Sequence, residues 1–192
     1  PAPAKLTGRP ETVKMVEDLM NPIALMDGDS LPVSAFMGNP DGQFEQGASA
    51  YEKRGTAVTV PTWDAAKCIQ CNQCAFVCSH ATIRPFMLSE DEVKAAPANI
   101  KLADTKPKAS EYKYTMSVSP LDCMGCGECI TVCPVGAIEM VPQESQAEEQ
   151  PVFDYLVANV GKKPGMPADN TVKGSQFNQP LLEFSGSCAG CA

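Results

Sequence analysis

Apolar residues recur at helical spacing near the start of the chain and then give way to polar, turn-forming residues. A helix from Thr12 would present one apolar face, formed by Val13, Val16 and Met20. Asn21-Pro22 predicts the end of this helix, because proline cannot continue it. Residues 27–30 favour a turn, and residues 38–49 hold too many helix and strand breakers for regular structure.

Alternation of apolar and polar positions takes over in the middle of the chain and predicts short strands. These strands are 57–60, which Pro61 ends, then 112–118, and a closing strand at 137–140. Ser89 and Glu92 form a capping box that opens a short helix, and Pro97 ends it. Residues 101–110 are polar and interrupted by proline, which predicts a loop.

The last part of the chain is polar, with one further helix. Residues 141–150 are acidic and favour a linker. A helix fits residues 151–160, since proline stands at its first position and Gly161 follows its end. Residues 162–180 are predicted to be a loop that packs along another domain.

Eight of the ten cysteines lie in two runs with the same C-x2-C-x2-C-x3-C spacing. The runs are Cys68, Cys71, Cys74 and Cys78, then Cys123, Cys126, Cys129 and Cys133. Structural zinc usually takes well-separated C-x2-C pairs, and disulfides need an export context that this sequence does not indicate. The spacing resembles that of bacterial ferredoxins, which hold two [4Fe–4S] clusters.

The spacing also predicts which cysteines share a cluster. Three thiolates separated by two residues each can converge from one curling loop, with backbone N–H groups pointing inward. A fourth thiolate, expected at the start of a helix, points away and serves the other cluster. We therefore expect cluster 1 to be bound by Cys68, Cys71, Cys74 and Cys133, and cluster 2 by Cys123, Cys126, Cys129 and Cys78.

Residues around the two runs suggest how the loops are shaped. Gly125 and Gly127 allow the backbone to wrap closely around cluster 2. The apolar residues expected to line a cluster pocket are Met124, Ile130, Val132, Val135 and Ile138. Pro134 follows the second run, whereas Ser79 takes the matching place after the first, so the geometry there should be looser.

A few other conspicuous residues have ordinary structural explanations. Trp63 is expected to pack in a core or interface, and His80 to be a surface or hydrogen-bonded histidine, although it could also tune a cluster potential. Residues 52–54 are expected to form a solvated turn or inter-domain ion pairs. Lys67 or Arg84 could help dock an acidic carrier if either is exposed.

Composition and charge exclude several classes of partner. The 192 residues include 17 prolines and 14 glycines, which suits a loop-rich fold held partly by metal, and the formal charge is −8. An acidic protein that binds anionic clusters is a poor ligand for nucleic acid or an anionic membrane. Without a membrane span or signal peptide in the sequence, we expect a cytoplasmic protein.

One family resemblance covers the chain from about Leu31 to its last residue. It rests on Glu52-Lys53-Arg54-Gly55, on CIQCNQC from Cys68, and on FSGSCAGC near the end. These motifs resemble those of the pyruvate:ferredoxin (or flavodoxin) oxidoreductases. The resemblance implies a relay of electrons from thiamine-dependent pyruvate decarboxylation to ferredoxin or flavodoxin. It also implies a homodimeric full-length enzyme that contains thiamine diphosphate, Mg²⁺ and a third [4Fe–4S] cluster.

The resemblance and the pattern together predict an α+β fold. The core is a bacterial-ferredoxin-like domain over residues 61–143 with an insertion at about 82–117, between an arm at 1–60 and a linker arm at 144–184. Residues 185–192 resemble the start of the thiamine-diphosphate domain, where Cys188 and Cys191 supply half of the third cluster's ligands. The first residue, Pro1, and the last, Ala192, suggest a piece of a longer polypeptide.

Two alternatives of other classes remain at this stage. The chain could be a stand-alone electron carrier or the small subunit of another 2-oxoacid oxidoreductase, with both arms used for adhesion. It could also be a zinc-stabilised structural module, in which the cysteines only hold the fold. The sequence contains no residues arranged for decarboxylation, so we expect conduction of electrons and no catalytic centre in this chain.

Overall fold

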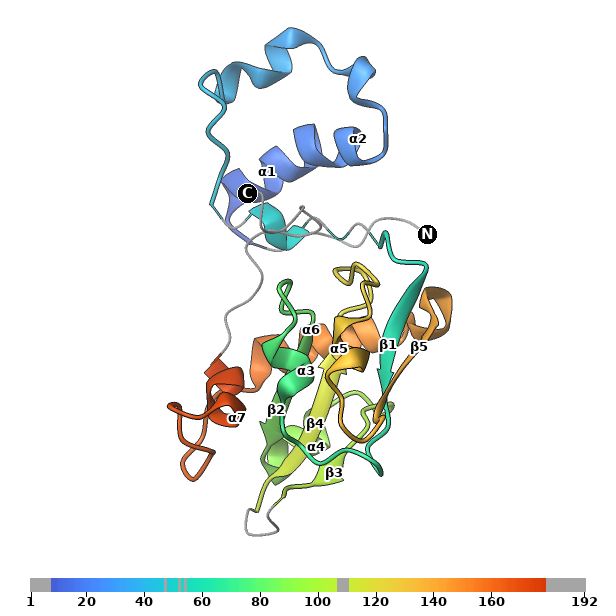
Figure 1. The fold of residues 1–192 in the computed structure, drawn as a ribbon. Helices are drawn as coiled ribbons and strands as arrows, with labels where there is room; N and C mark the ends of the chain where they lie inside the picture. Colours follow the sequence, from blue (N-terminus) through green and yellow to red (C-terminus); the bar gives the residue numbers. More distant parts are fainter. Residues whose placement is uncertain (1–7, 47, 52, 54, 107–110, 179–192) are drawn as a thin grey trace.

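Two small antiparallel sheets organise the chain (Figure 1). The computed structural model describes residues 8–46, 48–51, 53, 55–106 and 111–178. One sheet pairs β1 (Thr59–Trp63) with β5 (Ile138–Pro142), and the other has the order β2 (Ile83–Leu88), β4 (Lys113–Val118), β3 (Ala103–Asp104). With the helices described below, the predicted mixture of helix and strand is confirmed.

Each cysteine run contains one short helix. These helices are α3 (Gln73–Phe76) and α5 (Glu128–Thr131), which contact each other. Because β1 precedes the first run and β5 follows the second, the pairing of Trp63 with Ile138 closes the cysteine-containing region into one unit. The second sheet is built entirely from the segment between the two runs.

Pro61 lies inside β1, so the prediction that it ends a strand at residue 60 is wrong. In an antiparallel ladder, alternate N–H groups point to the partner strand. Asp64 N–H donates to Ala137 O at 2.9 Å, so the nitrogens at even positions face β5 and that of Pro61 faces away. Pro85 occupies the same kind of position in edge strand β2, which the sequence analysis missed.

The N-terminal helix starts at Pro10 and does not stop at Asn21-Pro22, so that prediction is also wrong. It runs as α1 (Pro10–Met15), a π-helical stretch η1 (Val16–Met20) and α2 (Asn21–Ala24). Asn21 N–H donates to Val16 O, five residues back. This wider turn changes the hydrogen-bond register just before Pro22, where an α-helical register would place the proline ring against a carbonyl.

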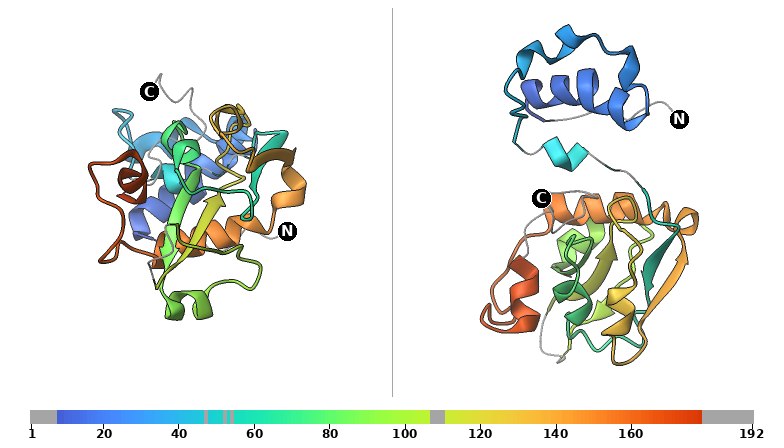
Figure 2. Two further views of the ribbon diagram at one scale, coloured as in Figure 1. Left: turned by 60° about the horizontal axis from the view of Figure 1, so that its bottom comes forward. Right: turned by 45° about the horizontal axis from the view of Figure 1, so that its top comes forward.

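The N-terminal helical segment lies apart from both sheets (Figures 1 and 2). It continues through short 3₁₀ turns: η2 (Gly28–Ser30), η3 (Val33–Gly38) and η4 (Ala48–Tyr51). Its own small core contains Met15, Val16 and Leu19. Gly55 N–H donates to Leu121 O at 2.8 Å and so ties the end of this segment to the cysteine-containing region.

The predicted capping box is confirmed in helix α4 (Glu90–Ala95), where Ser89 and Glu92 satisfy each other's backbone N–H groups. Prediction of a linker over residues 141–150 is wrong. Residues 143–146 form the 3₁₀ turn η5, and α6 (Glu149–Asn159) begins two residues earlier than expected. Buried Gln150 explains the difference, because its side chain accepts hydrogen bonds from Ser119 Oγ at 3.0 Å and Leu121 N–H at 3.1 Å.

Helix α6 packs on the three-stranded sheet. Val152 and Leu156 of α6 share a core with Phe86 and Leu88 of β2, and Phe153 lies edge-on to Phe86 at 6.4 Å between ring centroids. The predicted loop at 162–180 contains a further short helix, α7 (Val172–Ser175), and a 3₁₀ turn, η6 (Gln176–Asn178). No helix among the described residues is long and apolar enough to cross a membrane.

The core around the cysteines confirms the expectation for Trp63. Its side chain is 5% exposed and lies edge-on to Tyr114, with 5.8 Å between the ring centroids. Ile83 and Met116 belong to the same core, and so do several of the cysteines. The apolar interior of this fold is therefore shared with the thiol groups.

Replacing Leu156 with alanine tests whether α6 is part of the core. Leu156 is fully buried, so its truncation should destabilise the cluster-loaded protein by about 2–5 kcal/mol. Thermal melting under anaerobic conditions measures the effect. Leu25→Ala is the control, since Leu25 is 79% exposed and its loss should change stability by about 0.5 kcal/mol or less. Equal effects of the two substitutions would contradict packing of α6 on the sheet.

Candidate metal centre

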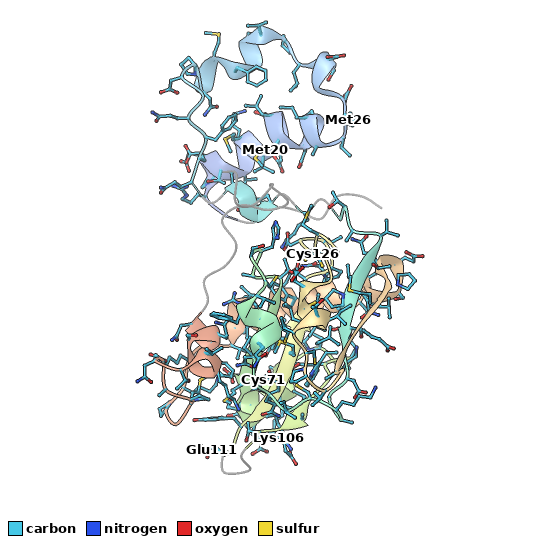
Figure 3. The ribbon with its side chains drawn as sticks, in the orientation of Figure 1. Met20, Met26, Cys71, Lys106, Glu111 and Cys126 are labelled. Carbon is cyan, nitrogen blue, oxygen red and sulfur yellow. The ribbon has the colours of Figure 1, made fainter. Side chains whose placement is uncertain are left out.

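Two cavities in the fold are lined by cysteine side chains. Cavity 1 is lined by Cys68, Cys71, Cys74 and Cys133, and cavity 2 by Cys78, Cys123, Cys126 and Cys129. Each cavity therefore collects three cysteines of one run and the last cysteine of the other run. These are the two sets of four that the spacing analysis grouped. Figure 3 shows Cys71 and Cys126 on the two different loops.

The short helices explain how each run is divided between the cavities. α3 and α5 each contain the third cysteine of their run, Cys74 and Cys129, and end before the fourth. The expectation that the fourth cysteine stands at the start of a helix is wrong, because Cys78 and Cys133 follow the helix ends. The short helix separates the third cysteine from the fourth, so the fourth cysteine of each run lines the other cavity, as predicted from the spacing.

Backbone N–H groups point at several of the sulfur atoms. Gln70 N–H donates to Cys68 Sγ at 3.3 Å, and Gly125 N–H donates to Cys123 Sγ at 3.4 Å. Ala137 N–H donates to Cys133 Sγ at 3.2 Å. The first two contacts join the same positions of the two loops. Such donors favour negatively charged sulfur, which is the form that binds metal.

Burial and the charges of neighbouring cysteines raise the pKa of three of the thiols. Burial, followed by the charge of Cys68, raises the pKa of Cys74 to about 12. Burial, followed by the charge of Cys123, raises the pKa of Cys129 to about 12, and burial also raises the pKa of Cys123. Eight thiolates in this space therefore require compensating cations, which metal supplies.

The arrangement of ligands favours a multi-atom cluster over a single ion. The four cysteines of each set line one hollow. Apolar side chains line it as well, including Ile69 and Ile138 in cavity 1 and Ile83 and Met140 in cavity 2. A ring of four thiols around an apolar hollow fits a [4Fe–4S] cluster.

The two loops adopt the same backbone turns with different residues. Gly125 and Gly127 have φ of +69° and +79°, and Gln70 and Asn72 occupy the matching positions with φ of +59° and +62°. A Cβ atom on Gly125 would lie 2.8 Å from Thr59 O, so glycine is needed there for close approach as well as for its φ. The predicted wrapping by glycines thus applies to the second loop only.

Gln70 and Asn72 are the residues that the sequence analysis missed. Both are 1% exposed. Gln70 Nε2 donates to Asp104 O at 2.7 Å, and its Oε1 accepts from Lys106 N–H at 2.8 Å. Comparison of CIQCNQC with CMGCGEC could have found them, since polar residues stand where the second run has glycines.

Asn72 makes the corresponding contacts to two other segments. Its Nδ2 donates to Lys173 O at 2.8 Å, and its Oδ1 accepts from Tyr114 Oη at 2.7 Å. Side chains of the first loop therefore bind β4, the loop after β3 and helix α7. In the second loop, glycines leave these positions without side chains.

The predicted pocket residues are only partly in place. Val135 and Ile138 line cavity 1 and Met124 lines cavity 2, whereas Ile130 and Val132 line neither. His80 is half-buried at the edge of cavity 2, beside Ser79, at 3.5 Å between Nδ1 and Oγ.

The proposed docking role of Arg84 is wrong, because its side chain is buried and stacks over the Phe86 ring at 5.7 Å. Lys67 is largely exposed and pairs with Asp64. Lys53 forms an ion pair with Asp122, in line with the inter-domain pairs expected for this segment. Glu52, Arg54, Cys188 and Cys191 lie outside the described residues.

Comparison with known proteins agrees with this site. A family model described as a 4Fe-4S dicluster domain matches residues 67–137, and the EKR model, a domain of unknown function, matches residues 2–57. The chain is 51% identical over 179 residues to the pyruvate-flavodoxin oxidoreductase of Enterobacter agglomerans. It is 49% identical over 178 residues to that of Klebsiella pneumoniae. Both alignments cover 92% of this chain and 15% of the relative.

The pyruvate:ferredoxin oxidoreductase of Moorella thermoacetica is 47% identical over 195 residues, which cover 99% of this chain and 16% of the relative. The chain thus spans 15–16% of the length of these three relatives. Similarity extends over nearly the whole chain and includes both the EKR segment and the cysteine runs, so the resemblance suggested by the motifs is confirmed. Over nearly its whole length, the chain is therefore similar to one segment of the pyruvate-flavodoxin and pyruvate:ferredoxin oxidoreductases, and residues 67–137 of that segment match a 4Fe-4S dicluster domain.

Proposed function

We propose that this chain is the electron-conducting part of a pyruvate:ferredoxin or pyruvate-flavodoxin oxidoreductase. The observation that carries the proposal is the pair of cysteine-lined cavities, each completed by one cysteine from the other run. Two redox centres held in one small fold are suited to passing single electrons across it.

The residues proposed to hold the two [4Fe–4S] clusters are those of the two cavities. Cys68, Cys71, Cys74 and Cys133 bind cluster 1, and Cys123, Cys126, Cys129 and Cys78 bind cluster 2. When bound, such clusters supply reversible one-electron redox chemistry. The protein supplies thiolates, N–H donors to sulfur at Gln70 and Gly125, and apolar walls that exclude water.

In the full-length enzyme, pyruvate is proposed to be decarboxylated on thiamine diphosphate with Mg²⁺, giving acetyl-CoA and CO2. Cys188 and Cys191 would supply half of the ligands of a third [4Fe–4S] cluster, completed by sequence outside this chain. Ferredoxin or flavodoxin would take the electrons from a cytoplasmic homodimer. The names and identities of the relatives support this proposal, as does the match to a dicluster domain.

The insertion and the arms are proposed to attach the cluster domain to the rest of the enzyme. The segment between the cysteine runs contributes β2, β3, β4 and α4, and α6 covers part of this sheet. The N-terminal arm is tied to the cluster domain by the Lys53–Asp122 ion pair and by Gly55. An independent electron carrier would not need such attachments, so they favour the interpretation that this chain is part of a larger enzyme.

Metal analysis tests the cofactor assignment. Protein purified without oxygen should contain about eight iron atoms and eight acid-labile sulfides per chain, because two cubane clusters have this content. Colorimetric iron and sulfide assays measure both, with total zinc measured on the same sample. Zinc without sulfide would contradict the electron-transfer role and favour a structural module.

Paired substitutions test the exchange of the fourth cysteine. If Cys78 binds cluster 2, the variant C78A/C126A loses one cluster and retains about four irons, whereas C78A/C71A loses both. Iron content and the spectrum of the reduced protein measure the outcome. The reverse result, with four irons kept in C78A/C71A and none in C78A/C126A, would show that each run holds its own cluster.

Removal of the clusters should unfold the cysteine-containing core. Metal binds the ligand set that the folded chain assembles and the unfolded chain lacks, so metal binding supplies part of the folding free energy. Chelation of iron in oxidised protein should abolish the cooperative thermal transition followed by circular dichroism. Reconstitution with iron and sulfide should restore it. An unchanged transition in the cluster-free protein would refute this dependence.

A further inference from the structure

A ring of hydrogen bonds joins the first cysteine loop to two segments from elsewhere in the chain. Lys106 Nζ donates to Cys68 O at 2.8 Å, and Lys173 Nζ donates to Lys106 O at 2.7 Å. Asn72 Nδ2 donates to Lys173 O at 2.8 Å, which returns the ring to the loop. In Figure 3, Lys106 lies at the Cys71 end of the fold and away from Cys126.

Gln70 and Asn72 are the anchors of this ring on the loop side. Each is almost fully buried, holds a left-handed backbone conformation that costs a non-glycine residue energy, and uses its side-chain amide to bind backbone groups. Gln70 holds both sides of the segment that carries Lys106, through Asp104 O and Lys106 N–H. Asn72 holds the segment that carries Lys173.

The two lysines place positive charge beside cavity 1. The Nζ of Lys106 contacts the carbonyl of a residue whose sulfur lines the cavity. Lys173 is half-buried, and burial lowers its pKa, whereas the charges of Cys68 and Cys71 act in the opposite direction. Within the part of the chain that the structure describes, no acidic residue lines cavity 1.

Cavity 2 has a different charge environment. Glu128 lines it, and the neighbouring Asp122 is already matched by Lys53. Cys126 is exposed, whereas no cysteine that lines cavity 1 is exposed. Among the described residues, the lysines whose ammonium groups donate to backbone carbonyls at or beside a cysteine loop are therefore on the side of cavity 1.

We propose that Gln70 and Asn72 are positioning residues that hold Lys106 and Lys173 beside cluster 1, and that these cations raise its reduction potential above that of cluster 2. The inference rests on the proposed function, since it requires both clusters. Reduction adds negative charge, and nearby positive charge stabilises the reduced form. An electron on this pair of centres would then reside mainly at cavity 1.

Shielding by the same segments acts in the opposite direction, because exclusion of water disfavours added charge. Lysine substitutions that keep the segments in place separate the two effects. The double variant K106Q/K173Q, made in the cluster-loaded protein, should shift one of the two reduction steps to lower potential. The shifted step should be the one at higher potential in the parent protein. Redox titration followed by electron paramagnetic resonance measures both steps.

Matched variants establish the roles of charge and position. K106R/K173R should retain the parent potentials, and K94Q, which removes an exposed lysine from α4, should shift neither step. Q70G/N72G, which gives the first loop the residues of the second, should shift the same step as the lysine variant. The lysine substitutions should add little in that background, because the cations are no longer held in place.

The outcomes separate failure of this inference from failure of the proposed function. Fewer than about eight irons in the parent protein would remove the basis of both. Full iron and sulfide content in K106Q/K173Q, with neither step shifted or with only the lower step shifted, would overturn the inference alone. If Q70G/N72G fails to assemble clusters, the lysine variants decide the charge effect, and Q70A and N72A measured separately decide the positioning effect.

Discussion

Eight neighbouring thiols, three of them buried, can remain together as metal ligands only when cations balance their charge. Without metal, burial and mutual repulsion raise the pKa of Cys74 and Cys129 to about 12, far above the usual range of a thiol. The same groups occupy space that aliphatic side chains would fill in another small core, beside Trp63 and Ile83. Packing and metal binding therefore depend on each other. The pairing of β1 with β5 brings the two cysteine runs together, and each proposed cluster would link them further because it takes ligands from both runs.

Chemical spacing was the most informative part of the sequence. The division of eight cysteines into two sets of four follows from local geometry alone, and the structure lines its two cavities with the same sets. The capping box at Ser89 was equally predictable, because all of its contacts lie within one helical turn. The errors at Pro61 and residues 141–150 share one cause. Edge position and burial of Gln150 depend on what lies beside the chain in space, which a local pattern does not encode. The error at Pro22 is local, because a π-helical turn shifts the hydrogen-bond register just before the proline.

The two cysteine loops show how one backbone can serve different surroundings. Both need left-handed turns at matching positions, and the second loop meets this need with Gly125 and Gly127. The first loop accepts the conformational cost of Gln70 and Asn72, whose amides bind three other segments. Glycine would relieve the strain but leave the backbone groups of those segments without partners, at a comparable or greater cost. The departure from the glycine pattern thus marks the loop on which the rest of the domain is assembled.

This asymmetry bears on how two chemically identical ligand sets can act as a directed pair. Four cysteines in the same spacing would give two centres of similar potential, and their environment has to distinguish them. The whole chain carries a formal charge of −8, so a local pair of cations is conspicuous where it occurs. Lys106 and Lys173 belong to the segment between the runs and to the segment after them, neither of which is needed to complete a cysteine set. The segments that carry Lys106 and Lys173 are therefore the parts of the chain best placed to make the reduction potentials of the two centres differ. A directed relay needs that difference.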